Sequence, residues 1–183
     1  MSTAHAITTA AQLLQVSTSE RCELLRGELI CMNAAGFEHG RIVSRINARL
    51  QFFVEEQQLG VTTGAETGFF IEENPDTVRA PDGGFVRQHR LPSEPVRGYF
   101  RGAPDLAVEV ISPEDRANEV LAKVHMWLDS GCRSVWTVDP KTQTITIHND
   151  KHRSITLEAG QTLDGGDVLP GFLLPVADIF RLS

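Results

Sequence analysis

The residue that most strongly suggests chemistry is Glu109, a carboxylate in the middle of the apolar segment Pro104-Asp-Leu-Ala-Val-Glu-Val-Ile111. This composition predicts a strand, and because strand side chains alternate, Glu109 shares a face with Ala107 and Ile111 while the other face is wholly apolar. In a central strand, an unpaired carboxylate would cost several kcal/mol, so a metal ion or polar partner is expected. At the edge of a sheet, Glu109 would face water instead.

Asp82 and Lys123 are the residues that can complete a site around Glu109. Asp82 follows Pro81 and precedes Glu109 by 27 residues. Two acids on adjacent strands can hold a hard cation such as Mg²⁺ through oxygen ligands, and a metal so placed can activate water and polarise a phosphodiester. Lys123 lies on the helix predicted after Glu109. Its ammonium could orient the attacking water or stabilise transition-state charge, unless it is simply solvated.

Three residues earlier in the chain are candidates for auxiliary roles. Glu28 could add a metal ligand from the first predicted strand pair. Glu38 and His39 begin the first long helix, where an acid also suits the helix dipole, and His39 could act as a general base near a phosphate. Each of the three is equally explained as a helix cap or a surface residue.

The three cysteines are widely spaced and odd in number, so the sequence predicts neither a disulfide framework nor a zinc site. All three, Cys22, Cys31 and Cys132, are therefore expected to be reduced, as in a cytosolic protein.

The elements that must position these residues follow from hydrophobic periodicity. Apolar residues at steps of three and four predict a helix over residues 38–58, and a second helix runs from the N-cap Ser112 to about residue 130. Strands are predicted over 61–71, 78–86, 104–111, 135–138, 144–148 and 154–157, and a hairpin turns at Arg26-Gly27. A short helix is expected over 10–15, and the apolar tail 170–180 should pack on the core. The sum is an α/β (α+β) fold with a mixed sheet flanked by helices.

Length and charge set further bounds. The 183 residues suit one domain, expected over 20–183 after an arm at 1–19. No apolar run is long enough to span a bilayer. The net charge of −7 is unfavourable for binding nucleic acid. The predicted loop at 87–103 contains a cluster of basic residues, namely Arg87, His89, Arg90, Arg97 and Arg101. They either form a local basic strip or are the solvated residues of an ordinary loop.

Several motifs together resemble the Uma2 family of restriction endonuclease-like proteins over residues 20–180. They are Glu23-Leu-Leu-Arg-Gly-Glu28, His39, Arg79-Ala-Pro-Asp82, Pro104-Asp-Leu-Ala-Val-Glu-Val-Ile-Ser-Pro113, Lys123, Trp127-Leu-Asp-Ser-Gly131, Val135-Trp-Thr-Val-Asp-Pro140 and Pro170-Gly-Phe172. The resemblance implies a PD-(D/E)XK fold in which Asp82 and Glu109 are the metal acids. The wider nuclease superfamily has its lysine two residues after the second acid, where this chain has Ile111, so the lysine role passes to Lys123. Gly83-Gly84 also departs from the apolar strand that the family has there.

These features favour a metal-dependent DNA endonuclease using Mg²⁺ or Mn²⁺. A homodimer is expected, because cutting both strands of a duplex favours two symmetric sites. Two alternatives remain open: a non-catalytic module that kept the nuclease fold, and a phosphodiesterase acting on RNA or small phosphoesters.

Overall fold

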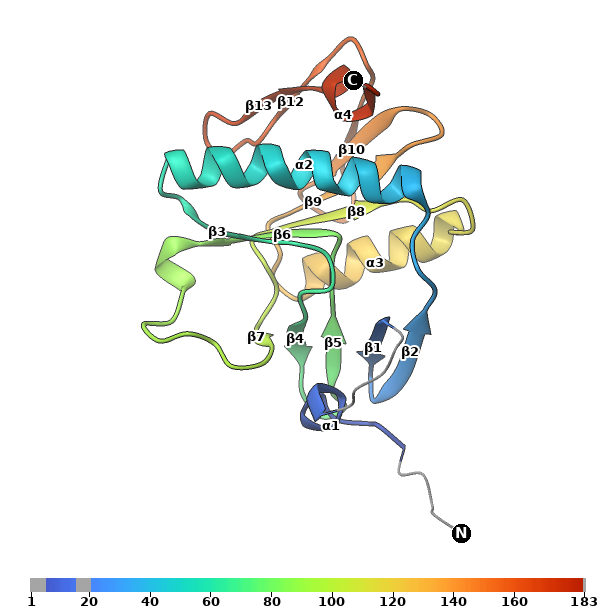
Figure 1. Cartoon of the computed structure of the whole chain (residues 1–183), viewed down its shortest axis with the longest axis vertical. Coiled ribbons are helices and arrows are strands. Elements are labelled where there is room, and N and C mark those ends of the chain that lie inside the picture. The colour runs from blue at the N-terminus through green and yellow to red at the C-terminus, as the bar shows by residue number, and fades with distance from the viewer. Residues whose placement is uncertain (1–5, 16–20, 183) are drawn as a thin grey trace.

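The computed structural model describes residues 6–15 and 21–182 (Figure 1). Its helices are α1 (Ala10–Gln15), α2 (Phe37–Glu56), η1 (Gln88–Arg90), α3 (Ala117–Asp129) and α4 (Val176–Phe180). Its strands are β1 (Arg21–Leu25), β2 (Glu28–Met32), β3 (Gly60–Thr63), β4 (Phe69–Glu72), β5 (Thr77–Arg79), β6 (Gly83–Arg87), β7 (Phe100–Arg101), β8 (Leu106–Val110), β9 (Ser134–Asp139), β10 (Thr144–His148), β11 (Ser154–Leu157), β12 (Thr162–Asp164) and β13 (Leu173–Pro175).

A six-stranded mixed sheet lies at the centre, in the order β11-β10-β9-β8-β6-β3. β8 pairs antiparallel with β6 and parallel with β9, and α3 makes the connection from β8 to β9. β8 is therefore an internal strand, which confirms the central position expected for Glu109 and excludes the edge alternative. The mixed sheet flanked by helices is confirmed.

Two helices cover opposite faces of this sheet (Figure 1). Ile42, Ile46 and Leu50 of α2 pack in one core cluster with the apolar face of β8, which confirms the predicted alternation. Val124 and Trp127 of α3 belong to a second cluster on the face that carries Ala107. Glu109 therefore points toward the layer that contains α3.

A smaller sheet in the order β2-β1-β5-β4-β7 lies below the central one (Figure 1). Two segments predicted as single strands were wrong in extent, because each divides between the two sheets. Residues 61–71 form β3 and β4, and residues 78–86 form β5 and β6. The second division falls at Pro81, which has no N–H to donate to a ladder. Asp82 consequently lies where the chain passes from one sheet to the other.

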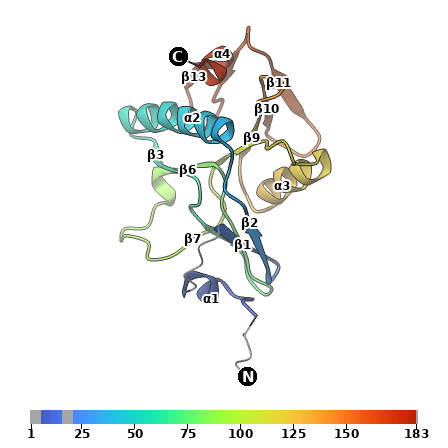
Figure 2. The same ribbon diagram turned by 45° about the vertical axis from the view of Figure 1, so that its right-hand side comes forward.

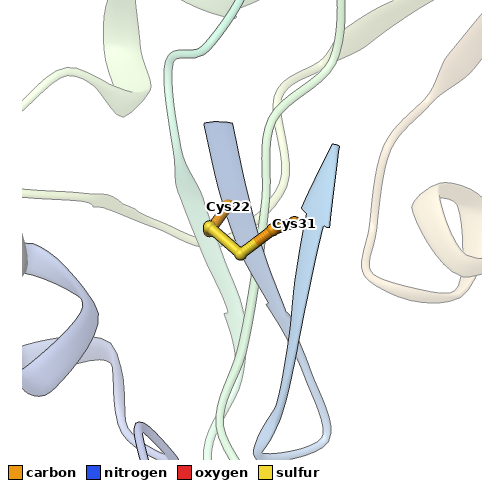
Figure 3. Close-up of a disulfide and its surroundings, with 2 residues drawn as sticks. All are labelled: Cys22 and Cys31. Carbon is orange, nitrogen blue, oxygen red and sulfur yellow. A yellow bond between two sulfur atoms is a disulfide. The ribbon is translucent and has the colours of Figure 1, made fainter. Parts of the chain in front are cut away.

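The predicted hairpin at Arg26-Gly27 forms, with φ of 49° and 76° at these residues, as a two-residue hairpin turn of the primed kind requires. Its register sets Cys22 opposite Cys31, and the two form a disulfide (Figure 3). The expectation that all three cysteines are reduced was therefore wrong for this pair. Cys132 is free and buried.

The second long helix begins later than predicted. The Ser112 N–H donates to Asp115 Oδ2 at 2.9 Å, as the capping pattern suggests, but the Asp115 N–H bonds back to Ser112 O and closes a separate turn. α3 starts only at Ala117 and ends at Asp129. This late start sets Lys123 in the middle of α3, one turn before Trp127.

The two ends of the described chain also pack inward. Ala10 and Leu13 of α1 are buried against Leu24 and Val78, as part of a third core cluster. The remainder of the expected arm, residues 1–5 and 16–19, lies outside the described residues. The predicted packing of the tail is confirmed by the buried side chains of α4. Among the described helices, none is long and apolar enough to cross a bilayer.

Candidate active site

Asp82 is held at the beginning of β6 by contacts from three elements. Its Oδ2 accepts a 2.9 Å hydrogen bond from the Val110 N–H and lies 3.2 Å from His39 Nε2. Its Oδ1 lies 3.8 Å from Arg21 Nη1. Asn47 Nδ2 of α2 donates to the Asp82 carbonyl at 2.8 Å. Only 7% of the side chain is exposed, so its orientation is fixed by these partners.

The glycine that follows Asp82 explains how α2 approaches so closely. A Cβ at Gly83 would lie 2.1 Å from Asn47 Oδ1. Gly83 is buried and pairs with Val108 in β8, so the strand forms despite the glycine pair. The glycine at this position therefore leaves room for the Asn47 side-chain amide, which donates to the Asp82 carbonyl.

Glu109 is enclosed by two side chains of α3. Trp127 Nε1 donates to Glu109 Oε1 at 2.7 Å, and Lys123 Nζ lies 3.8 Å from Oε2. Burial raises the pKa of Glu109 to about 7, although the charge of Lys123 and the indole hydrogen bond act to lower it. The negative charges of Asp82 and Glu23 raise it further. Glu109 is thus a largely buried carboxylate, with 12% of its side chain exposed, in surroundings that favour its neutral form.

The register of the central sheet brings the two acids together. Gly83 pairs with Val108 on antiparallel strands, so one further step along the same register sets Asp82 opposite Glu109. The hydrogen bond from the Val110 N–H to Asp82 and the electrostatic effect of Asp82 on Glu109 agree with this proximity. Asp82 with His39, and Glu109 with Lys123, form two adjacent pairs.

His39 lies at the beginning of α2 with its side chain 11% exposed. The hydrogen bond to Asp82 raises the pKa of His39, and burial opposes that rise. Its Nδ1 is buried and has no hydrogen-bond partner among the described residues. A cavity of about 360 Å³ opens beside this pair, with Arg21, Asn33 and Glu66 in its lining.

The other two auxiliary candidates lie elsewhere. Glu28 is exposed at the start of β2, beside the hairpin turn and opposite Leu25. Glu38 pairs with Arg41 Nη2 at 2.7 Å, and this hydrogen bond lowers the pKa of Glu38. Neither is brought by these contacts to Asp82 or Glu109.

Sequence reasoning missed several residues that shape the site. Glu23 is buried in β1, where its Oε1 accepts the Ala80 N–H at 2.9 Å and its Oε2 lies 3.1 Å from Arg79 Nε. Trp127 was identified from the sequence only as part of a family motif, with no role at the site, yet its indole N–H donates to Glu109. Its spacing of four residues from Lys123 was the available signal, because residues four apart share a helix face.

The basic strip predicted in the loop at 87–103 is largely neutralised. Arg90 Nη1 pairs with buried Asp105 at 2.9 Å, and Arg87 Nε lies 4.0 Å from the same carboxylate. Arg101 lies 3.6 Å from Glu73 and over the ring of Phe70. Arg87 and Arg90 are therefore bound within the fold, whereas His89, Arg97 and Arg101 are exposed, as the solvated-loop alternative expected.

The donor set at Asp82 and Glu109 fits a hard divalent cation. Both donors are carboxylates, and burial raises the pKa of Glu109, so a nearby cation would stabilise its ionised form. Within residues 6–15 and 21–182, no group of three or more histidine, cysteine, aspartate or glutamate side chains could itself hold a metal ion. Mg²⁺ is commonly held by one or two carboxylates together with waters and substrate phosphates, so two acids suffice.

Comparisons with known proteins identify the family and the fold of the chain. Residues 10–177 match the family model described as "Uma2: Putative restriction endonuclease". The chain belongs to the Uma2 family. A solved structure titled as a "putative nuclease belonging to DUF820", from Anabaena variabilis, aligns over 94% of this chain and 97% of its own with a TM-score of 0.82. At 20% sequence identity, this likeness shows a shared fold. No curated protein matches the chain. Membership of Uma2 confirms the resemblance read from the motifs.

Proposed function

We propose that this Uma2 protein is a metal-dependent endonuclease that hydrolyses DNA phosphodiester bonds. The observation that carries the proposal is the buried pair of carboxylates at the junction of β6 and β8, with an ammonium from α3 beside them. Such acids are costly to bury unless they have a cation to bind. Family membership supports action on nucleic acid.

Asp82 and Glu109 are the residues that would hold Mg²⁺ or Mn²⁺. Bound there, the ion would lower the pKa of a water and polarise the phosphate. Lys123 Nζ lies 3.8 Å from Glu109 Oε2 and the side chain is one-third exposed, so its ammonium can orient the attacking water and stabilise developing negative charge. Trp127 holds the Glu109 carboxylate by its indole N–H.

His39 acts on Asp82 in this proposal. The hydrogen bond to Asp82 raises the pKa of His39, so this contact favours the imidazolium form, in which Nε2 donates to Asp82. The role of His39 is therefore to position the Asp82 carboxylate, and general-base action by His39 would require a lower pKa than this contact favours.

The test is cleavage of a supercoiled plasmid with Mg²⁺ or Mn²⁺ and with EDTA. The parent protein should nick or linearise the plasmid only with metal, and Asp82→Asn and Glu109→Gln should abolish cleavage while retaining the fold. Glu28→Gln is a matched control that changes an exposed carboxylate outside the site. Unchanged cleavage by Glu109→Gln would contradict the proposal.

Two observations favour a second candidate, a non-catalytic module with the nuclease fold. Ile111 stands where the wider superfamily has its lysine, and the net charge is −7. Failure to bind Mn²⁺ at millimolar concentration by calorimetry would favour the module. Cleavage of RNA or small phosphoesters but not DNA would assign the same chemistry to another substrate.

We also propose a homodimer, since two symmetric sites would cut both strands of a duplex. Light scattering after gel filtration tests this, and a monomer at working concentration would contradict it.

A further inference from the structure

A groove of about 440 Å³ on the outer side of α2 is lined mainly by basic side chains. Arg41, Arg45 and Arg49 recur every four residues along the helix, and Arg181 joins them from beyond α4. Figure 2 shows α4 above α2 at this side of the molecule. Ser44 and Ala48 also line the groove, and their small side chains leave its floor accessible.

The charge of this groove is opposite to that of the whole chain. Four guanidinium groups stand against the carboxylates of Glu38 and Asp178, which pair with Arg41 and Arg181 at 2.7 Å and 2.8 Å. The chain as a whole carries a net charge of −7. A positive excess confined to one groove of an acidic protein can direct an anionic ligand to that place.

Two of the arginines are held in fixed orientations by neutral groups. Arg41 Nη1 donates to the Arg181 carbonyl at 2.8 Å, and Arg45 Nη1 donates to the Asp178 carbonyl at 3.0 Å and to that of Arg181. Carbonyl oxygens satisfy donors without cancelling the charge, which leaves the charge of Arg45 available, whereas Arg41 also donates to both oxygens of the Glu38 carboxylate and is 14% exposed. Because these side chains are already ordered, an anion would bind them at a lower entropic cost.

Arg49 contributes nothing to the fold through its head group. Its side chain is exposed, and among the described residues it makes no hydrogen bond or ion pair. It lies two turns from Arg41, so the arginines span about 12 Å along the helix axis. This spacing presents guanidinium groups in series, as a polymer of phosphates would require.

We propose that this groove binds successive phosphates of a nucleic-acid backbone outside the active site. Guanidinium groups bind phosphate oxygens in a bidentate manner, and the series begins at Arg41, two residues from His39. The groove therefore begins at the end of α2 that bears the candidate active site, but on another side of the helix, because residues two apart do not share a face. The inference rests on the proposed function for its choice of polymer.

An anionic membrane is the less suitable partner. An interfacial helix inserts its apolar face among lipids, but Ile42, Ile46 and Leu50 of α2 are buried in the central core. The groove lining itself holds arginine, serine, alanine and aspartate. Its contacts would be electrostatic and independent of base sequence.

Arg49→Gln is the decisive variant, because it removes a charge without removing a contact within the fold. Arg133→Gln is the matched control. Arg133 is exposed and lies directly before β9, outside the groove and four residues before Thr137, which pairs with Glu109. Binding of a fluorescein-labelled 20-base-pair duplex is measured by anisotropy in EDTA, across a series of salt concentrations. We expect the slope of log affinity against log salt to fall by about one for Arg49→Gln and to stay unchanged for Arg133→Gln.

The outcomes separate this inference from the proposed function. An unchanged slope and affinity in Arg49→Gln, or no duplex binding by the parent at low salt, overturns the groove assignment, whatever the cleavage assay shows. A reduced slope in Arg49→Gln supports the groove even if no variant cleaves DNA, a result that would contradict the proposed activity alone. Arg49-dependent binding to phosphatidylserine vesicles without binding to DNA would also overturn the assignment.

Discussion

In the parent protein, the carboxylate of Glu109 makes the free energy of unfolding depend on pH. Glu109→Gln should remove most of this dependence. The pKa of Glu109 is raised from 4.5 to about 7, mainly by burial. Each unit of pKa difference between folded and unfolded states is worth about 1.4 kcal/mol. The ionised carboxylate therefore destabilises the folded state by about 3 kcal/mol at pH 8.

The direction follows from proton binding. The folded protein binds the Glu109 proton more tightly than the unfolded chain, so this stabilisation is fully present below pH 4.5 and is lost as the pH rises through about 7. Glutamine keeps a carbonyl oxygen for the Trp127 indole and cannot ionise. The difference in free energy of unfolding, variant minus parent, should thus increase by about 3 kcal/mol from pH 4.5 to pH 8.

Urea denaturation in EDTA, followed by the fluorescence of buried Trp127 and Trp136, measures this difference at several pH values. Taking the difference removes contributions from other groups, such as His39, whose raised pKa acts in the same direction. Glu28→Gln serves as the exposed control. This expectation is refuted if the free energy of unfolding of Glu109→Gln minus that of the parent stays constant within about 0.5 kcal/mol from pH 4.5 to pH 8. The folded state would then not disfavour the ionised carboxylate.

Three further changes test the supports of the site. Replacing Cys22 and Cys31 by serine opens a loop with a sequence separation of 9 and should lower the free energy of unfolding by about 2.5 kcal/mol in urea; dithiothreitol should do the same to the parent and nothing to the variant. Gly83→Ala sets a Cβ 2.1 Å from Asn47 Oδ1, so it should destabilise the fold by about 1–3 kcal/mol and lower plasmid cleavage, whereas equal stability would show that the helix can move away. Trp127→Phe removes the hydrogen bond that lowers the pKa of the buried carboxylate, and the midpoint of the pH dependence should move to higher pH; an unmoved midpoint would contradict the bond.

The features that sequence predicted well are those decided by local periodicity. The alternation in residues 106–110 determined which side chains of β8 face α2, and the structure has Leu106, Val108 and Val110 in that core. The hydrophobic repeat of α2 set its length within two residues at each end. Such patterns depend on one face being buried, whatever element buries it.

The features that sequence missed depend on contacts between distant segments. Whether residues 78–86 form one strand or two is decided by which sheet each half joins. Pro81 indicates an interruption of the strand, but it does not indicate that the two halves belong to different sheets. The disulfide was a different kind of omission. A two-residue turn at Arg26-Gly27 already sets Cys22 opposite Cys31, so the hairpin prediction contained the pairing although the cysteine spacing taken alone did not.

The position of the lysine shows how the fold can supply the same charge from another element. A lysine at Ile111 would extend from the strand on the face of Glu109, where a half-buried apolar side chain now lies. Because β8 and β9 are parallel neighbours, the chain between them must cross back along the sheet, and α3 does so over the face of Glu109. Residues four apart on that helix share one side, which is why Lys123 and Trp127 both reach the same carboxylate. One turn of α3 thus places both the ammonium and the indole N–H beside Glu109. The site has a positively charged side chain even though position 111 is isoleucine.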